Sequence, residues 1–382
     1  MTIQLLFNNI TCVSFFLLAL IAFFNPSKLN LVANKWFALF LFSAGCMLLN
    51  SIIYRAGAES TYTQLIAFNE LSRFLIAPAL YLSVVHFTSP DKVLQPREYF
   101  HFIPFVLFFI YISPVVVAPA YQGVSFFQLP EVIHRHMPAL MQWAIRLQLL
   151  AYWVMAWMQL NKHQKNIREI HSAVTDIDLK WLRYLLLGII FLLVTWMASA
   201  GTPSLEAFTP ALYLGGVLCI GYYLLAQKEI YLFETAELVE IGQVIAHNLP
   251  KAPKQRFADE RAMRLKEKLQ TLMVSEKIYL DSELSLPQLA KMMDVSTHDL
   301  SYLLNDSFGV NFFNFVNRYR VDEAKQLMLS GQNKHLNLLG IAYSAGFNSK
   351  TTFNMAFKKQ AGLSPSEFMK QGAIEPLMGL QN

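Results

Sequence analysis

Seven long apolar runs in the first 227 residues constrain the fold of this chain more than any other feature. An α-helix needs about 20 predominantly apolar residues to cross the hydrocarbon core of a bilayer. A soluble fold built from so many apolar helices would have almost no polar surface. We therefore predict a transmembrane helical bundle of about seven spans in residues 1–227. The runs are about Leu5–Phe24, Trp36–Tyr54, Leu65–Phe87, Tyr99–Val117, Pro138–Leu160, Trp181–Ala200 and Phe208–Ala226.

Charged side chains are few in this first part and frequent in the rest of the chain. Residues 1–227 hold 13 basic and 9 acidic side chains, whereas residues 228–382 hold 18 and 17. The charged fraction of the whole chain is 15%, against about 25% in average soluble proteins. The chain therefore joins one part suited to lipid and one suited to water, and this composition excludes a disordered protein or a disulfide framework.

The distribution of basic residues between loops predicts the orientation of the bundle. Basic loops stay in the cytoplasm. The second, fourth and sixth loops carry only Arg55 and Arg135, so we expect the N-terminus outside and residues from Lys228 onward in the cytoplasm. The first run lacks a basic n-region and an obvious cleavage site, so we expect a retained span. The first, third and fifth loops carry Lys28, Lys35, Lys92, Arg97, Lys162, Lys165, Arg168 and Lys180.

Two pairs of polar side chains lie at membrane depth. Glu70 and Arg73 are three residues apart, and Gln142 and Arg146 are four apart, so each pair shares one helix face. Charges inside a membrane are costly and often functional. One interpretation is an outward-facing ligand pocket in which Arg73 or Arg146 meets an anionic group. The other is a structural Glu–Arg pair that fixes the helix register.

Nothing in the sequence predicts an enzyme. Cys12, Cys46 and Cys219 all lie in predicted spans without metal-ligand spacing, so we expect neither a disulfide nor a metal site. Walker loops, kinase motifs and HExxH are absent from the sequence, and isolated histidines lack partners at catalytic spacing. We therefore predict no catalytic residues and no cofactor.

Residues 228–265 are predicted to form a juxtamembrane helix and a linker. The apolar residues of Lys228–Asn248 are spaced loosely like one helix face, which fits either pairing with a second copy or a solvated stalk. The two prolines of Leu249–Lys254 then break the helix. Residues 266–382 are expected to form the C-terminal domain.

This C-terminal domain contains two similar stretches, Leu286–Gly309 and Leu338–Gly362. Ala290 corresponds to Ala342 at an offset of 52 residues, and Ser296 corresponds to Ser349 at an offset of 53. Each stretch predicts a short amphipathic helix, a tight turn and a second helix. The turns fall at Asp294 and Gly346, and Gly suits a positive φ better than Asp does. Ser296 and Ser349 are placed as N-caps of the second helices.

A single amphipathic helix is predicted between the two stretches, at Asn311–Ser330. About 20 residues at 1.5 Å each give a helix of ~30 Å. Two recognition helices that enter consecutive turns of the major groove need a separation of about 34 Å. The length is therefore of the right order for two linked DNA-binding motifs.

The sequence of Leu269–Met369 resembles the AraC/XylS family of bacterial transcription regulators. The most specific part is IAYSAGFNSKTTFNMAFKKQAGLSPSEF, and YRVDEAKQLML fits the helix between the family's two helix-turn-helix motifs. The resemblance implies that base contacts come from His298, Ser301 and Tyr302 in the first recognition helix and from Thr351, Asn354 and Met355 in the second. It implies phosphate contacts from Ser296, Ser349, Lys350 and Lys358.

Two of these positions depart from the family's usual pattern. Family members often carry Arg where this chain has Tyr302 and Met355, and Arg is the usual bidentate partner of guanine. Asn354 remains suited to adenine, and Tyr302 or Met355 to thymine methyl groups. Residues 251–382 hold 17 basic and 13 acidic residues, a mild positive balance, so affinity is expected to need a homodimer or two half-sites.

Together these features predict an all-α, multi-pass regulator of the bacterial inner membrane that binds promoter DNA. The expected partners are double-stranded DNA, the lipid bilayer, a second copy on DNA, RNA polymerase, and a small-molecule or membrane signal of unknown identity. A different class of function stays open. In it, the bundle is a transporter or receptor and the C-terminal helical domain docks a protein partner.

Overall fold

The computed structural model describes residues 3–58, 61–89, 95–117, 131–173, 178–198, 203–226, 259–330 and 336–378. These ranges form helices and no strand, apart from an isolated bridge between His171 and Ser285. The predicted all-α class is confirmed. The chain divides into two units: unit 1 is Met1–Asn161 with Leu179–Ile230, and unit 2 is Lys162–Asp178 with Tyr231–Asn382.

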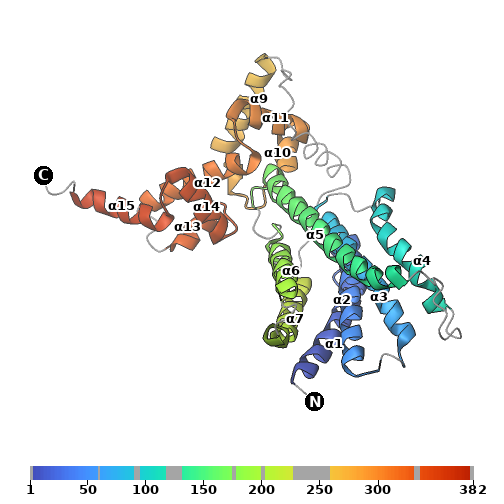
Figure 1. Cartoon of the computed structure of the whole chain (residues 1–382). Helices are drawn as coiled ribbons and strands as arrows, with labels where there is room; N and C mark the ends of the chain where they lie inside the picture. Colours follow the sequence, from blue (N-terminus) through green and yellow to red (C-terminus); the bar gives the residue numbers. More distant parts are fainter. Residues whose placement is uncertain are drawn as a thin grey trace. The chain divides into compact units, whose positions relative to one another are not determined.

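Unit 1 contains the helices that correspond to the seven apolar runs (Figure 1). Each predicted run overlaps one α-helix. The fourth begins with a 3-10 turn, η1 (Pro96–Phe102), so its α-helical part is shorter than expected. The α-helices are α1 (Ile3–Phe24), α2 (Leu31–Arg55), α3 (Thr63–Thr88), α4 (Ile103–Val117), α5 (Glu131–Ile170, whose last residues belong to unit 2), α6 (Lys180–Ala198) and α7 (Pro203–Leu225).

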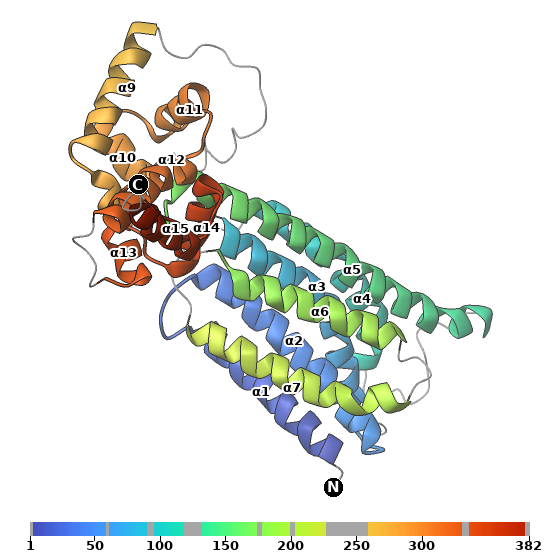
Figure 2. The same ribbon diagram turned by 90° about the vertical axis from the view of Figure 1, so that its left-hand side faces the viewer.

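The apolar helices of unit 1 pack side by side, and α2 lies between α1 and α3 (Figure 2). Phe37 of α2 is fully buried, and its ring contacts Phe87 and Trp181 edge-on. Large apolar side chains also point outward, among them Phe24 and Leu225, which are 74% and 73% exposed. Monomeric soluble proteins rarely leave large contiguous apolar surface in water, whereas lipid tails solvate such side chains without cost.

Three helices in the described residues are long and apolar enough to cross a membrane. They are Leu5–Phe24, Leu31–Arg55 and Phe68–Thr88, and Ala211–Leu225 is a shorter apolar helix. The structure thus establishes apolar helices in the N-terminal part of the chain. The full count of seven spans stays a prediction.

Unit 2 contains the repeated stretches and the helix between them. Its elements are α9 (Asp259–Val274), η2 (Ile278–Leu280), α10 (Leu286–Met293), α11 (Thr297–Phe308), α12 (Phe312–Leu329), α13 (Leu338–Ser344), α14 (Lys350–Ala361) and α15 (Pro365–Met378). The helix predicted at Asn311–Ser330 is confirmed as α12, with Asn311 as N-cap and Ser330 as C-cap.

The long helix α12 contributes to both apolar cores of this unit. Phe312, Phe315 and Val316 pack in the first core with α9, α10 and α11. Val321 and Ala324 pack in the second core with α13 and α14. Each repeat thus folds around its own end of α12. The juxtamembrane helix predicted at Lys228–Asn248 and the break predicted at Leu249–Lys254 lie outside the described residues.

Candidate nucleic-acid interface

The first repeat folds into a helix-turn-helix, and the N-cap predicted at Ser296 is confirmed. A capping box begins α10: Gln288 N donates to the Ser285 hydroxyl, and Ser285 N donates to Gln288 Oε1 at 2.8 Å. Asp294 ends α10 with a φ of 59°, in the left-handed region. The Ser296 hydroxyl then accepts from Asp299 N at 3.1 Å and begins α11. The left-handed residue thus ends the first helix and the serine cap begins the second.

The second repeat has the same construction and a tighter turn. The Ser349 hydroxyl accepts from Thr352 N at 3.2 Å and begins α14. Gly346 has a φ of 87°, and a Cβ added there would lie 2.5 Å from the Tyr279 carbonyl oxygen and 2.8 Å from Leu280 Cα. Backbone therefore approaches backbone at this turn, and glycine is required both by the positive φ and by the space.

The second helix of each repeat divides into a buried and a polar face. Leu300, Leu303 and Leu304 of α11 are buried, as are Phe353, Ala356 and Phe357 of α14. The turns and caps therefore fix which side chains α11 and α14 present to solvent.

The candidate DNA contacts on α14 all lie on its exposed face. Thr351, Asn354 and Met355 are exposed, and so are Lys350 and Lys358. Lys350 is the first residue of the helix, where free backbone N–H groups and the helix dipole favour a phosphate. This face can therefore present amide, thioether and ammonium groups to a duplex.

The candidates on α11 are less accessible. His298 and Tyr302 are half-buried, and Tyr302 packs against the first core while its hydroxyl lies 3.4 Å from Asp306 Oδ1. Ser301 is buried, with 8% of its surface exposed. The contact predicted for Ser301 therefore has the least structural basis of the six. The roles of all six residues stay predictions.

The helix α12 is hydrogen-bonded to the second motif and to η2. Lys359 Nζ donates to Asn314 Oδ1 at 2.8 Å, and Gln360 Nε2 donates to Asp322 Oδ1 at 2.8 Å, which connects α14 to α12. On the other side, Arg320 Nε donates to the Tyr279 carbonyl at 2.7 Å, next to the first motif. At 18 residues, α12 is ~27 Å long. Both motifs thus pack against the same helix, α12.

Arg320 is a residue that our reading of the sequence did not single out. Its side chain is fully buried, and burial lowers its pKa to about 10, so it stays a cation at neutral pH. Its position along the helix could have identified it from the sequence. Arg320 follows Phe313 and Val316 at helical spacing, which places a charge on the apolar face of α12.

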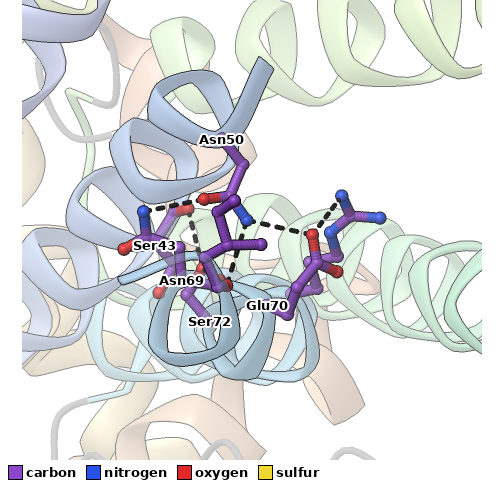
Figure 3. Close-up of polar contacts among 7 residues, drawn as sticks. Ser43, Asn50, Asn69, Glu70 and Ser72 are labelled. Carbon is purple, nitrogen blue, oxygen red and sulfur yellow. Dashed lines mark hydrogen bonds and ion pairs between the residues drawn. The ribbon is translucent and has the colours of Figure 1, made fainter. Parts of the chain in front are cut away.

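A second polar cluster lies between α2 and α3 in unit 1 (Figure 3). Glu70 Oε1 contacts Arg73 Nη2 at 2.7 Å, and Asn50 Nδ2 donates to the same oxygen at 2.9 Å. Asn69 Nδ2 donates to Asn50 Oδ1 at 2.8 Å, and both asparagines are buried. The pair expected from the sequence is therefore part of an interhelical network. Asn50 and Asn69 could have been found as polar residues inside apolar runs.

The other polar pair of the sequence analysis is described only in part. The Gln142 side chain lies outside the described residues. Arg146 is half-buried, and its guanidinium lies over the Trp143 ring, 5.1 Å from the centroid. Within the described ranges, no three His, Cys, Asp or Glu side chains gather in a way that could hold a metal ion.

Comparison with known proteins concerns the C-terminal domain. Residues 289–371 match the helix-turn-helix domain family. The transcriptional regulatory protein HptR of Staphylococcus aureus (strain NCTC 8325 / PS 47) is 29% identical over 90 residues, which are 24% of this chain and 34% of the relative. The probable transcriptional regulator LumQ of Photobacterium leiognathi is 27% identical over 104 residues, which are 27% of this chain and 41% of the relative.

The chain thus spans between a third and two fifths of the length of these curated relatives. A solved structure of the C-terminal domain of AraT, a response regulator from Geobacillus stearothermophilus, is 26% identical and covers 31% of this chain and 88% of that one, with a TM-score of 0.25. A solved structure of a Listeria innocua protein of unknown function is 26% identical and covers 28% of this chain and 94% of that one, with a TM-score of 0.24. The C-terminal part of the chain carries an AraC-type helix-turn-helix domain, as the sequence resemblance predicted.

Proposed function

We propose that the protein is a membrane-bound, sequence-specific transcription regulator, and that it is a DNA-binding protein rather than an enzyme. Two capped helix-turn-helix motifs on one helix, with Thr351, Asn354 and Met355 exposed, carry this proposal. The transcriptional regulators that resemble this domain support it. Promoter DNA is the proposed partner, bound by a homodimer that in turn contacts RNA polymerase.

The proposal is tested with the full-length protein in lipid nanodiscs. A pool of random 30-base-pair duplexes is selected for binding, and the recovered sequence is then compared with a scrambled duplex over a range of salt concentrations. Specific binding is expected to be at least 10³-fold tighter than binding to the scrambled duplex, with a steep salt dependence of both. Equal affinity for every duplex would instead favour a protein-docking role for the domain.

For the N-terminal part we propose seven spans of the bacterial inner membrane, with the N-terminus outside and the C-terminal domain in the cytoplasm. The apolar helices and the surplus of basic residues in the odd-numbered loops support this orientation. A green fluorescent protein fused after Asn382 is expected to fluoresce, and an alkaline phosphatase fused there is expected to be inactive. Active phosphatase at this position would place the domain away from the chromosome.

We further propose that the bundle senses a signal near Arg73, which passes to the DNA-binding domain. Arg73 Nε is buried without a hydrogen-bond partner among the described residues, although Nη2 pairs with Glu70. Such a donor suits an anionic ligand that competes with Glu70. The four residues Glu70, Arg73, Gln142 and Arg146 are the proposed ligand site.

Removal of either arginine is expected to change the response to the signal without changing DNA binding in the absence of the signal. Arg73→Ala or Arg146→Ala should shift the output of a reporter driven by the selected operator across growth conditions. The affinity of the purified protein for the operator should stay at the wild-type value. Arg55→Ala is the matched control, because Arg55 is exposed at the end of α2. A wild-type reporter response from both variants would leave the Glu70–Arg73 pair with a structural role only.

A further inference from the structure

The C-terminal end of α5 lies against the helix-turn-helix domain, inside unit 2. Ile167 and Phe313 form a buried apolar contact, with 1% and 4% of their surfaces exposed. The Arg168 guanidinium lies over the Phe313 ring, 5.9 Å from its centroid. Asn311 Nδ2, at the N-cap of α12, donates to Glu169 Oε1 at 3.3 Å. One turn of α5 thus covers the beginning of α12.

Ser172, two residues after α5 ends, is the centre of a buried polar network. Its hydroxyl donates to the Leu284 carbonyl at 2.6 Å and accepts from Arg320 Nη2 at 3.0 Å. Its carbonyl accepts from Asn317 Nδ2 at 3.0 Å. Ser172 and Arg320 are fully buried, and Asn317 is 2% exposed. We call the contact of Ile167–Ser172 with Leu284, Asn311, Phe313, Asn317 and Arg320 the docking contact.

The docking contact has the energetics of a specific site. A buried cation without acceptors is strongly destabilising. Arg320 donates to Ser172, to Asn317 Oδ1 and to the Tyr279 and Asp281 carbonyls. Removal of the segment would break the hydrogen bonds that Arg320 and Asn317 donate to Ser172 and would expose both side chains to water, which lowers the stability of this part of α12. A nonspecific apolar patch would not carry this cost, because it has no directional bonds to lose.

The same helix is anchored at its other end in unit 1. Among the described helices, α5 alone is divided between the units, at Asn161 and Lys162. In unit 1, Trp153 Nε1 donates to the Leu186 carbonyl of α6 at 2.7 Å, and Gln148 Nε2 donates to the Phe74 carbonyl of α3 at 3.3 Å. The backbone of α5 is one uninterrupted helix from Glu131 to Ile170, so Ile167–Ser172 is covalently continuous with the part of α5 that belongs to unit 1.

We propose that Ile167–Ser172 is a built-in docking segment through which the fifth membrane helix holds α12 and keeps both helix-turn-helix motifs competent to bind DNA. This inference rests on the proposed function above. The exposed residues of α14 take no part in the docking contact, so the docked form leaves that recognition helix available. A signal that moves α5 withdraws the segment, loosens α12 and weakens operator binding.

The first test measures docking without DNA. Amide hydrogen exchange is followed by mass spectrometry in the full-length protein in nanodiscs. Ile167→Asp puts a carboxylate into the buried contact and is expected to raise exchange in Phe312–Arg320 about 10-fold or more, because local opening becomes cheaper. Exchange in α14 should stay unchanged. Lys165→Asp is the matched control, since Lys165 is exposed one half-turn away. Ser172→Val is a second variant, which removes only the hydroxyl contacts.

The second test measures the consequence for DNA. In the same nanodiscs, Ile167→Asp and Ser172→Val are expected to weaken binding to the selected operator at least about 5-fold, the lower end of ordinary coupling between sites. Lys165→Asp should bind like the wild type. None of the three substitutions lies in the helix-turn-helix domain, so direct base and phosphate contacts stay intact.

The outcomes separate the two proposals. Identical exchange in Ile167→Asp and Lys165→Asp would overturn the docking contact. Faster exchange in Ile167→Asp with unchanged operator affinity would show that the docking contact is only structural. It would overturn the proposed coupling between docking and DNA binding. If the wild type bound no duplex selectively, the proposed function would fail, while the exchange result would still decide whether the segment docks.

Discussion

Gly346→Ala is expected to unfold the second helix-turn-helix motif, whereas Gly362→Ala is expected to leave it folded. Both glycines have positive φ, at 87° and 76°, and an L residue there costs about 1–2 kcal/mol. Only at Gly346 would the new Cβ meet backbone atoms, 2.5 Å from the Tyr279 carbonyl and 2.8 Å from Leu280 Cα. Overpacking of this kind adds roughly 1–3 kcal/mol.

The difference can be measured as amide exchange in α13 and α14, because all six tryptophans lie in residues 1–227 and do not report on this domain. Gly346→Ala should lower the free energy of opening of α14 by roughly 2–5 kcal/mol and Gly362→Ala by roughly 1–2 kcal/mol. Nothing lies within 4 Å of the Cβ position at Gly362. Equal effects of the two variants would show that the close approach to η2 does not exist in solution.

Asn354→Ala is expected to remove the discrimination at one base pair of the operator. Asn354 is exposed on α14, and an Asn side chain can bond adenine N6 and N7 together. Loss of such a bidentate contact costs about 1–3 kcal/mol, a factor of about 5 to 150 in affinity. Binding to the matched operator should weaken, while binding to an operator substituted at that base pair should change little.

Lys358→Ala is the matched control, one helical turn further along α14 and also exposed. A phosphate contact carries no sequence information. This variant should therefore weaken every duplex alike and reduce the salt dependence by about one ion. The base-contact assignment of Asn354 is wrong if its variant weakens matched and substituted operators equally.

Tyr302 needs a different substitution from Asn354. A Tyr302→Ala variant is expected to weaken binding, but Tyr302 also packs against the first core, so the alanine variant mixes loss of contact with loss of stability. Tyr302→Phe keeps the ring in place and removes only the hydroxyl.

The sequence predicted those features that depend on residues close together in the chain. Serine caps bond amides three residues on, so Ser296 and Ser349 could be placed without a structure, and both caps form. Gly346 and Asp294 could be placed in the turns for the same reason, and both have positive φ. The periodicity of Asn311–Ser330 likewise predicted α12 within a residue at each end.

The docking contact could not be predicted in this way, because its partners are far apart in the chain. Ser172 and Arg320 are separated by 148 residues. The sequence identifies Lys162, Lys165 and Arg168 only as basic residues of an expected loop, which says nothing about a tertiary contact. The hydrogen bond between Asn50 and Glu70 could not be predicted for the same reason, because it joins α2 to α3 and its residues are 20 positions apart in the chain. Polar residues on apolar helix faces can be recognised in the sequence, but the sequence does not show which residues they contact.

The division of α5 between the two units has a consequence for protein engineering. A DNA-binding domain cut out after the last apolar helix lacks Ser172 and would expose Arg320 and Asn317 to water. A chimera that transplants this domain onto a foreign anchor should therefore graft Ile167–Ser172 along with residues 259–378, although the two pieces are not contiguous in the gene.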